Sequence, residues 1–407
     1  MKGRKGKDTP DMADDSISRR RMLQLAAAAA VVVGANPRGL GQLSWGAQVD
    51  APSSNGLRTH VTRPYDAETD VAVFREWLTP NEKFFVRSHF GPPAPDAIDP
   101  ARWRLSVSGL VDTPLDLTLS DLNRLEQVTI TAVLQCSGNG RANQRPRVPG
   151  VQWERGAVGN ARWTGVRLRD VLEQAGLDRS KAKHVQLEGA DRPVSTKTPL
   201  FFRSIPMVKA LHPATLVVYR MNDEPLPVLH GGPLRLVTPG WMADSWTKWL
   251  AAIRVQGHEA EGYYMQTAYR HPTAPVESGA SVSGGDMVPV EEMIVKSLIV
   301  TPGEGAEVSA GPVTIAGVAW TGEARVTRVE VSMDDGRHWK PATLLGNDVP
   351  YAWRRWEYRW DAAASGPVTL LCRATDSRGD VQPERSSWNP GGFLWNGWDR
   401  VSVTVAA

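Results

Sequence analysis

Residues 130–141 read Ile130-Thr-Ala-Val-Leu-Gln-Cys-Ser-Gly-Asn-Gly-Arg141, and they contain one of the two cysteines in the chain. The apolar run from Val128 to Leu134 is typical of a β-strand. It leads Cys136 into a glycine-rich loop, where no bulky side chain covers the sulfur, and Arg141 lies close enough in sequence to favour thiolate over thiol. A thiolate presented in this way is a soft metal ligand or a nucleophile. These residues alone leave a purely structural role for Cys136 equally open.

This segment resembles a known metal-binding sequence. Residues 135–141, Trp153 and residues 161–166 are similar to the segment that carries the molybdenum-ligating cysteine in the sulfite oxidase family of molybdopterin enzymes. Further matches at similar spacing are Phe84-Phe-Val-Arg-Ser-His89, Glu188-Gly-Ala-Asp191, Tyr219-Arg-Met-Asn222, Pro225-Leu-Pro227, His230-Gly-Gly-Pro-Leu-Arg235, Pro239-Gly240, Thr247-Lys-Trp-Leu250 and Trp388-Asn389. The similarity covers roughly residues 70–405. One such motif is weak evidence, but this many in sequence order are strong.

Length and charge narrow the class of protein. A chain of 407 residues has room for two or three domains with sizeable cores. The formal net charge is +3, and residues 1–35 account for all of it, since they hold seven Lys/Arg and four Asp/Glu. The remaining residues carry 40 of each sign, so no global basic field exists to attract nucleic acid or an anionic membrane.

The first residues predict export. Ser18-Arg-Arg-Arg-Met-Leu23 precedes an apolar run of 14 residues, 22–35, which is too short to span a bilayer. Paired arginines before such a run indicate a twin-arginine signal and hence a periplasmic protein, and the alternative is a disordered basic tail. Residues 36–69 are rich in Gly, Pro, Ser and Asn, and we interpret them as a linker or extended arm.

Residues 70–291 predict an α+β domain with a mixed sheet. Trp103, Leu105 and Val107 alternate as in a strand, residues 120–125 read as a short capped helix, and residues 168–176 give a clearer helix. In that helix the apolar residues share one face and Gly176 ends it. Short strands and helices alternate without a βαβ rhythm, which favours a mixed sheet.

Residues 292–407 have a different pattern, that of a β-sandwich. Period-two strands are predicted at residues 297–300, 313–318, 326–333, 368–374 and 401–405, and Asp334-Asp-Gly336 signals a hairpin. Cys372 is in phase with the inward residues, so we assign it to the core. The resemblance independently implies an immunoglobulin-like dimerisation domain here, and hence a homodimer.

The resemblance also implies a site. It assigns Cys136 as the metal ligand of one molybdenum–molybdopterin cofactor per chain. It places Arg87, Arg141, Trp153 and Tyr269 at the substrate pocket. The residues that it assigns to cofactor binding are Arg87, Ser88, His89, Cys136, Asp191, His230, Arg235, Trp246, Thr247 and Lys248. Without the family spacing, Arg87 reads as a solvated charge and His230 as a turn residue.

One position departs from the resemblance. The animal and plant enzymes have a pocket arginine two residues after Trp-Asn, and this chain has Gly391 there. The loss of a guanidinium weakens anion binding by about 1.5–3 kcal/mol, unless Arg354 or Arg355 compensates. A larger or less charged substrate is the other explanation.

The function implied is oxidation of sulfite to sulfate. Neither cysteine belongs to a haem-attachment motif, so electrons are expected to pass to an external acceptor, a cytochrome c or dioxygen. Two alternatives are open. The first is the same cofactor acting on another sulfur compound, such as reduction of an S-oxide, and the second is a cofactor-free secreted binding protein.

Overall fold

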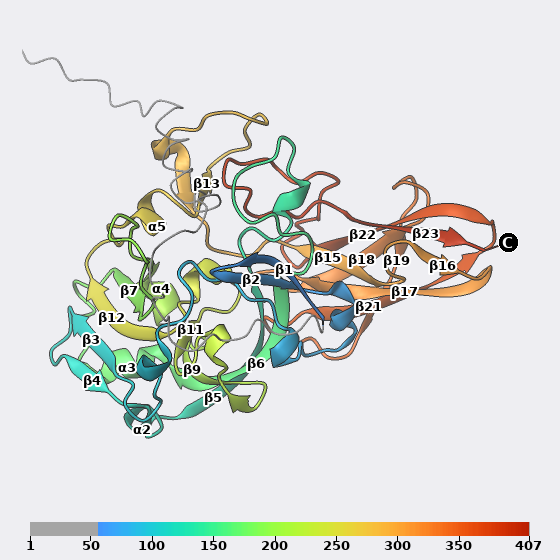
Figure 1. Cartoon of the computed structure of the whole chain (residues 1–407). Coiled ribbons are helices and arrows are strands. Elements are labelled where there is room, and N and C mark those ends of the chain that lie inside the picture. The colour runs from blue at the N-terminus through green and yellow to red at the C-terminus, as the bar shows by residue number, and fades with distance from the viewer. Residues whose placement is uncertain (1–55, 407) are drawn as a thin grey trace, which may run out of the picture. The chain divides into compact units, whose positions relative to one another are not determined.

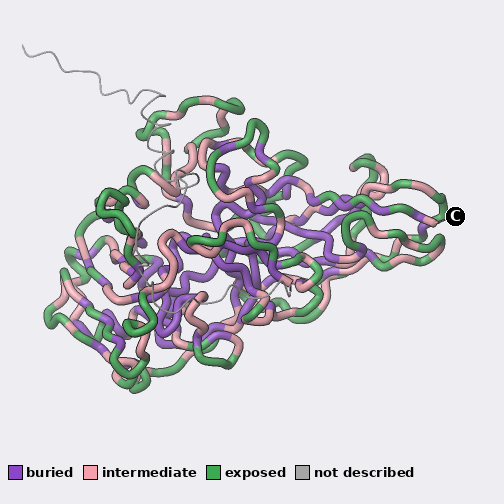
Figure 2. The backbone as a smooth tube through the Cα atoms, viewed as in Figure 1, coloured by how far each residue is buried: buried purple, intermediate pink, exposed green. Residues whose placement is uncertain are grey.

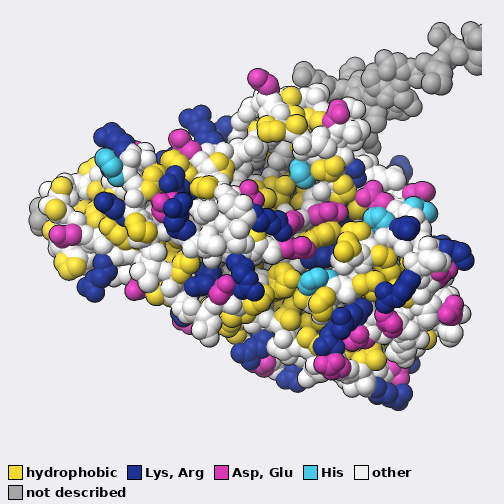
Figure 3. Space-filling view, turned by 180° about the vertical axis from the view of Figure 1, so that it is seen from behind, with side chains coloured by type: hydrophobic (Ala, Val, Ile, Leu, Met, Phe, Trp, Pro, Cys, Tyr) yellow, Lys and Arg dark blue, Asp and Glu magenta, His cyan; other side chains and the backbone are white. Residues whose placement is uncertain are grey.

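The computed structural model describes residues 56–406, all of which belong to one compact unit of the chain, residues 46–407 (Figure 1). The predicted export signal, residues 1–35, lies outside the described residues. Buried stretches run through the middle of this unit, and exposed segments surround them (Figure 2). On one face, Lys and Arg side chains are interspersed with Asp and Glu (Figure 3).

Two five-stranded sheets build the first part of the fold. One has the order β10-β9-β6-β5, with β11 also paired to β9. Its strands are β5 (Gln127–Gln135), β6 (Val158–Arg167), β9 (Leu216–Met221), β10 (Glu224–Pro225) and β11 (Arg235–Val237). The apolar run before Cys136 therefore forms strand β5, as predicted, and it pairs with β6 in unbroken antiparallel register from Gln127 to Gln135.

The second sheet has the order β4-β3-β12-β7-β8. Its strands are β3 (Leu105–Gly109), β4 (Leu115–Leu117), β7 (His184–Gly189), β8 (Phe202–Pro206) and β12 (Leu250–Gln256). Strand β12 is parallel to β3 and antiparallel to β7, which confirms the predicted mixed sheet. The helices are short: α2 (Leu119–Leu122), α3 (Leu168–Gln174), α4 (Met207–Ala210) and α5 (Tyr263–Gln266).

Two predicted helices are present. In α3 the predicted apolar face is fully buried, and Gly176 follows with a φ of +72°, a left-handed conformation that favours glycine at a helix end. Helix α2 begins earlier than expected, because Thr118 is its cap and not Ser120. Thr118 and Asp121 each accept the other's backbone N–H, which forms a capping box.

The structure describes residues 56–69 of the segment that we interpreted as a linker or extended arm. Residues 57–69 form an antiparallel hairpin of β1 (Leu57–Thr62) and β2 (Tyr65–Thr69). Four consecutive residues of β2, from Asp66 to Thr69, are buried. Three of these four side chains, Asp66, Glu68 and Thr69, are polar, so β2 lacks the apolar period that predicts a strand.

Residues 296–405 contain two sheets, a β-sandwich as predicted. One has the order β15-β17-β21-β20, and the other β16-β23-β22-β18-β19. The strands are β15 (Lys296–Thr301), β16 (Ala306–Val308), β17 (Gly311–Trp320), β18 (Val326–Ser332), β19 (Lys340–Pro341), β20 (Thr343–Leu345), β21 (Arg354–Ala362), β22 (Gly366–Asp376) and β23 (Asp399–Val405). Strands β16, β19, β20 and β21 were not predicted.

Two details of the sandwich agree with the sequence. The turn at residues 334–336 joins β18 to β19, and Asp335 and Gly336 both have positive φ, as a tight hairpin requires. Cys372 is fully buried in the core, and its sulfur lies 3.2 Å from Ser297 Oγ.

The remaining elements are short. They are β13 (Arg270–Pro272), β14 (Met287–Pro289) and the 3-10 turns η1 (Val71–Arg75), η2 (Asn81–Lys83), η3 (Pro95–Ala97), η4 (Arg141–Asn143), η5 (Val228–His230), η6 (Ala243–Ser245) and η7 (Gly284–Asp286). Strands β13 and β14 pair with each other in a separate two-stranded sheet. None of the helices within residues 56–406 is long and apolar enough to cross a membrane.

The sandwich contacts the loop that follows β5. Trp320 Nε1 donates to Gln135 Oε1 at 2.6 Å, and the backbone N–H of Leu394 donates to Ser137 O at 3.0 Å. A side chain at Gly140 would come within 2.5 Å of the Trp395 ring, so this glycine allows the loop to pack against the sandwich. The first part of the fold and the sandwich thus both hold the loop that carries Cys136 in place.

Candidate functional site

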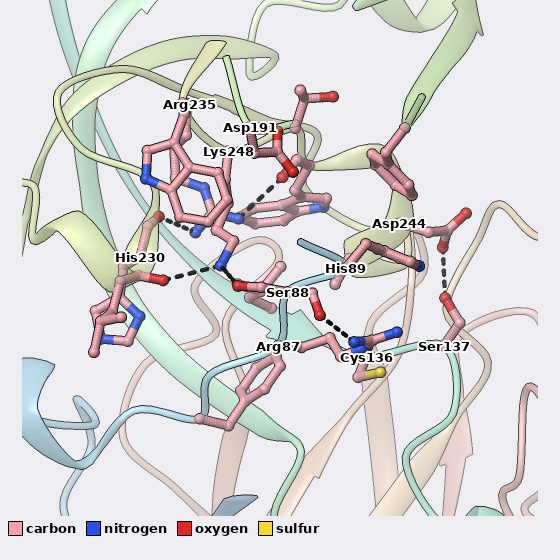
Figure 4. Close-up of a pocket in the computed structure, with 18 of the residues that line it drawn as sticks. Arg87, Ser88, His89, Cys136, Ser137, Asp191, His230, Arg235, Asp244 and Lys248 are labelled. Atoms are coloured by element: carbon pink, nitrogen blue, oxygen red, sulfur yellow. Dashed lines mark hydrogen bonds between the residues drawn. The ribbon is translucent and has the colours of Figure 1, made fainter. Parts of the chain in front are cut away.

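A pocket of about 720 Å³ opens where β5 ends. Figure 4 shows side chains from β5 and from distant loops converging on it. Eleven of the thirteen site residues predicted from the sequence line it: Arg87, Ser88, His89, Cys136, Asp191, His230, Arg235, Trp246, Thr247, Lys248 and Tyr269.

Cys136 lies in this pocket directly after β5. Its backbone N–H donates to Ala157 O at 2.9 Å, which continues the β5–β6 ladder and fixes the residue. The residue is 7% exposed, so the thiol is accessible only through the pocket. Burial raises the pKa of the Cys136 thiol, while the charges of Arg141 and Arg87 act in the opposite direction. A bound metal ion would replace the proton, because the thiolate is the form that ligates metals.

Ser137, the residue after Cys136, anchors the loop through a hydrogen bond to a buried ion pair. Ser137 donates to Asp244 Oδ1 at 2.5 Å, and Asp244 Oδ2 forms an ion pair with Arg203 Nη2 at 2.7 Å. Both charged side chains are 1% exposed. Replacing one partner of such a pair would leave an uncompensated buried charge. This ion pair therefore holds Ser137, and with it the loop of Cys136, in place.

Arg87 lies on the same side of the pocket as Cys136 (Figure 4). Its Nη1 is 3.0 Å from Asp66 Oδ2 and also donates to Ser88 O. Burial lowers the pKa of Arg87, but Asp66, together with Tyr269 and Cys136, more than offsets this, and the net pKa is raised. The guanidinium is therefore a permanent cation near Cys136.

Two further cations face the pocket without a carboxylate partner within ion-pair distance among the described residues. Lys248 Nζ donates to Ser88 Oγ at 2.7 Å and to Leu229 O at 3.0 Å. Arg235 donates only to carbonyl oxygens, including His230 O at 2.7 Å. Burial, assisted by Arg235, lowers the pKa of Lys248 to about 7, and burial lowers the pKa of Arg235 to about 9. An anion bound here would stabilise both cations.

His230 is not a third cation. Burial lowers its pKa to about 3, so the imidazole is neutral. Its Nε2 lies 2.8 Å from Asn81 O, and we assign the proton to that nitrogen because a carbonyl can only accept. The resemblance placed His230 among the residues that bind the cofactor. In this geometry its backbone carbonyl, which holds Arg235, is the clearer contribution.

The far end of the pocket is polar. Burial raises the pKa of Asp191 to about 6. Thr247 Oγ1 is buried and has no hydrogen-bond partner among the described residues. Unpaired buried polar atoms are costly, so a hydroxyl left open toward a pocket indicates a polar ligand.

The remaining wall is aromatic. Tyr269 hydrogen-bonds with His89 Nε2 at 3.0 Å, and burial raises the pKa of Tyr269, so its hydroxyl stays protonated. His89 stacks on Phe201 with ring centroids 4.4 Å apart. Burial lowers the pKa of His89 well below its usual value. This wall is therefore neutral, and Tyr269 can donate its hydroxyl proton to a ligand when His89 Nε2 is the donor in the bond between them.

Two predicted residues, Arg141 and Trp153, do not line the pocket. Arg141 donates to Gly391 O at 3.1 Å and to Val151 O at 3.0 Å, and its guanidinium lies over the Phe393 ring at 5.3 Å. Trp153 is fully buried in the core cluster that includes Cys136. Arg141 therefore acts on the pocket through its charge and not by contact.

The proposed compensation for Gly391 is not found. Arg354 lies 3.5 Å from Asp348 in the sandwich, Arg355 is on the exposed side of β21, and neither lines the pocket. A side chain at Gly391 would come within 2.2 Å of the Phe393 ring. This loop therefore has no room for a larger residue while Phe393 keeps its place.

Sequence reasoning missed Asp66, Ser137, Phe201, Arg203 and Asp244. Ser137 and Phe201 line the pocket beside predicted residues, and Asp244 both lines it and pairs with Arg203. Asp66 and Arg203 are polar residues buried within strands, and the other three lie outside the strands, so none of the five follows an apolar period. Adjacency to Cys136 was the one available signal, and it applied to Ser137 alone.

Comparisons with known proteins agree with this geometry. The oxidoreductase molybdopterin binding domain matches residues 90–264, and the Mo-co oxidoreductase dimerisation domain matches residues 288–406. The chain is thus an oxidoreductase of the molybdopterin-binding class with an attached dimerisation domain.

Its relatives narrow the class. Sulfite oxidase of Gallus gallus is 37% identical over 367 residues, covering 86% of this chain and 78% of that protein. The Arabidopsis thaliana enzyme is 31% identical over 381 residues, covering 88% and 96%. Mitochondrial sulfite oxidase of Homo sapiens is 37% identical over 366 residues, and the match covers 86% of this chain but 66% of that protein. The chain belongs to the sulfite oxidase family.

A solved structure has the same fold along the whole chain. The sulfane dehydrogenase SoxCD from Paracoccus pantotrophus aligns with a TM-score of 0.75 and 26% identity, and the match covers 98% of this chain and 100% of that one.

The residues present fit a molybdenum–molybdopterin cofactor. A phosphorylated pterin requires cationic and polar donors at one end and a soft metal ligand at the other. The pocket offers Lys248 and Arg235 without a carboxylate partner among the described residues, an open Thr247 hydroxyl, and the Cys136 thiol. These three features fit an anionic cofactor with a soft metal.

Proposed function

We propose that this protein oxidises sulfite to sulfate and passes the electrons to an external acceptor. The observation that carries the proposal is the position of the Arg87 cation near a pocket thiol, in a chain of the sulfite oxidase family. Sulfite is a small oxyanion, and a guanidinium binds two oxygens at once. The electron acceptor is a cytochrome c or dioxygen.

In this proposal Cys136 ligates the molybdenum. Lys248, Arg235 and Thr247 hold the pterin phosphate, and Asp191 and the backbone near Trp246 bind polar edges of the pterin. When bound, the cofactor supplies oxygen-atom transfer and accepts two electrons. Arg87 orients the anion, and the neutral Tyr269 hydroxyl donates a hydrogen bond to it. Arg141 adds positive charge from behind the pocket wall.

The proposed setting is the periplasm, reached by the twin-arginine route. The Arg-Arg-Arg motif before an apolar run supports it. The dimerisation-domain match supports a homodimer, and the two-sheet sandwich supports an immunoglobulin-like module.

A steady-state assay tests the substrate. The molybdenum-loaded protein is expected to oxidise sulfite with cytochrome c as acceptor, and an oxygen electrode covers dioxygen. Arg87→Gln is expected to raise KM for sulfite roughly 10- to 150-fold, as the loss of a charge-assisted hydrogen bond of about 1.5–3 kcal/mol implies. Arg337→Gln, in an exposed turn of the sandwich, is the matched control. Equal KM values for Arg87→Gln and the parent would contradict the proposal.

A second candidate is oxidation or reduction of another sulfur compound. Two observations favour it: the donors of Arg141 are occupied by Gly391 O and Val151 O, and the SoxCD structure is named for a sulfane substrate. Higher kcat/KM for a sulfane sulfur compound, or for a sulfoxide with a reduced dye, than for sulfite would favour this candidate.

A further inference from the structure

The hairpin β1–β2 contacts Arg87 and Ser88, which line the pocket, although it lies outside both family-model matches. Strand β2 lies beside the segment that carries Arg87. Ala67 and Val86 exchange both backbone hydrogen bonds, at 2.9 and 2.8 Å. This pairing sets Asp66 directly against Arg87 and Ser88.

Asp66 makes three contacts with that segment. Its Oδ1 accepts from the Ser88 backbone N–H at 2.9 Å, and both of its oxygens lie within 3.3 Å of Arg87 Nη1. Asp66 is 1% exposed, so water cannot replace these contacts. The Ser88 hydroxyl in turn accepts from Lys248 Nζ. The buried Asp66 carboxylate therefore holds the Arg87 guanidinium. It also holds the backbone of Ser88, whose hydroxyl contacts the second pocket cation, Lys248.

The hairpin is itself held rigidly. The next inward residue, Glu68, is 4% exposed, and its Oε2 accepts from the Glu154 backbone N–H at 2.9 Å. The Thr69 backbone N–H donates to Gly156 O at 3.0 Å. A side chain at Gly156 would approach Thr69 O to 1.9 Å, so this contact requires glycine. The residue after Gly156, Ala157, accepts the Cys136 backbone N–H.

We propose that the β1–β2 hairpin is part of the site and that Asp66 is the positioning residue of Arg87. Asp66 fixes the guanidinium so that its remaining donors face the pocket. It acts through Arg87 and does not touch the substrate. The inference rests on the proposed function only for the identity of the anion that Arg87 binds.

Two roles for Asp66 predict opposite results. If Asp66 positions Arg87, its loss weakens binding of a pocket oxyanion. If it only supplies a negative charge, its loss makes the pocket more positive, and the oxyanion binds more tightly. The sign of the change therefore separates the two roles.

The experiment uses the full-length, molybdenum-loaded protein and three variants: Asp66→Ala, Asp66→Asn and the exposed neighbour Asp70→Asn. Calorimetry measures the Kd of sulfate, and assays measure KM and kcat for sulfite. We expect Asp66→Ala to raise both the sulfate Kd and the sulfite KM at least tenfold. Asp66→Asn retains an acceptor oxygen for Ser88, so it should recover part of the loss, and Asp70→Asn should match the parent.

A double-mutant cycle with Arg87→Gln tests whether Asp66 acts through Arg87. We expect the double variant Asp66→Ala/Arg87→Gln to bind sulfate no more weakly than Arg87→Gln alone, because both changes remove one function. Independent, multiplying losses would overturn the proposal, as would tighter sulfate binding by Asp66→Ala. Molybdenum content and Tm are measured for every variant.

A crystal structure of Asp66→Ala tests the proposal without any substrate. Arg87 is expected to lose its single orientation. An unchanged Arg87 would refute positioning by Asp66, even if the parent failed to oxidise sulfite. Failure of the parent to oxidise sulfite, with Arg87 displaced in the variant, would instead refute only the proposed function.

Discussion

Lys248→Met should change the cofactor-free and the loaded protein in opposite directions. Lys248 Nζ contacts Ser88 Oγ and Leu229 O and lies over the Trp249 ring at 4.3 Å, but it has no carboxylate within ion-pair distance among the described residues. We infer that this cation serves an anion that is bound later. Methionine has a similar volume, so the substitution removes the charge and little packing.

The direction of the stability change in the cofactor-free protein follows from the pKa of Lys248. Burial lowers the pKa of Lys248 to about 7 in the folded protein, from an ordinary value of about 10.4 in the unfolded chain. Below pH 7 both states are protonated, and the folded state bears the full cost of the buried charge. Between pH 7 and about 10.4 the folded state loses its proton and the cost fades. Stability gained by Lys248→Met in the cofactor-free protein is therefore largest below pH 7 and absent near pH 10.4.

The pKa shift sets an upper limit on the stability that Lys248→Met can add. Each pKa unit corresponds to about 1.4 kcal/mol, so the shift allows at most roughly 5 kcal/mol. Water reaches part of this side chain, so we expect about 1–3 kcal/mol, or roughly a 1–4 °C rise in Tm for a chain of this length. In the loaded protein the variant loses a charge-assisted hydrogen bond of about 1.5–3 kcal/mol, so the cofactor should bind roughly 10- to 150-fold more weakly.

Calorimetric melting of cofactor-free protein between pH 6 and 10, with molybdenum content after gel filtration, measures both effects. Lys340→Met, at an exposed position on β19, is the control and should change neither. A cofactor-free Lys248→Met protein that melts below its parent at pH 6 and retains full molybdenum would refute the reasoning, because Lys248 would then be a structural residue.

Three further changes test other parts of the structure. Lys296 is 1% exposed, its Nζ has no hydrogen-bond partner among the described residues, and burial lowers its pKa to about 7. Lys296→Met should therefore raise Tm below pH 7 by the same linkage as Lys248→Met, without altering the molybdenum content. No gain at pH 6 would show that the ammonium is compensated. Asp244→Asn should cost about 3–5 kcal/mol in urea unfolding, because it leaves the Arg203 charge buried, whereas a loss below about 1 kcal/mol would contradict the buried pair. Gly156→Ala should lower stability by about 1–3 kcal/mol and raise KM for sulfite, since a methyl group would push Thr69 and the hairpin away; a parent-like KM and Tm would show that the contact is not needed.

Periodic apolar patterns made much of the fold predictable. The inward face of α3 and the period-two strands around Cys372 gave helix and sandwich directly, because burial on one side selects one residue period. Strand β21 was missed because its sequence, residues 354–362, is rich in charged and aromatic side chains that are mostly not buried. The β1–β2 hairpin was missed because Asp66 and Glu68 are buried through hydrogen bonds.

The site was predictable only in part. Family spacing placed eleven residues in one pocket, although they range from Arg87 to Tyr269 in the sequence. The same spacing could not reveal that Arg141 is held by carbonyl oxygens of Gly391 and Val151, because that contact depends on how a loop of the sandwich packs. Nor could it reveal Asp66, whose role depends on a hairpin outside the matched domains.

X-ray absorption at the molybdenum edge, on protein that turns over sulfite, tests the role of Cys136 most directly. We predict one cysteinyl sulfur bound to the metal in addition to the sulfurs of the pterin, and one sulfur fewer in Cys136→Ser with the molybdenum content unchanged. An identical number of sulfur neighbours in the parent and in Cys136→Ser would show that this thiol does not bind the metal, and the site described here would be wrong.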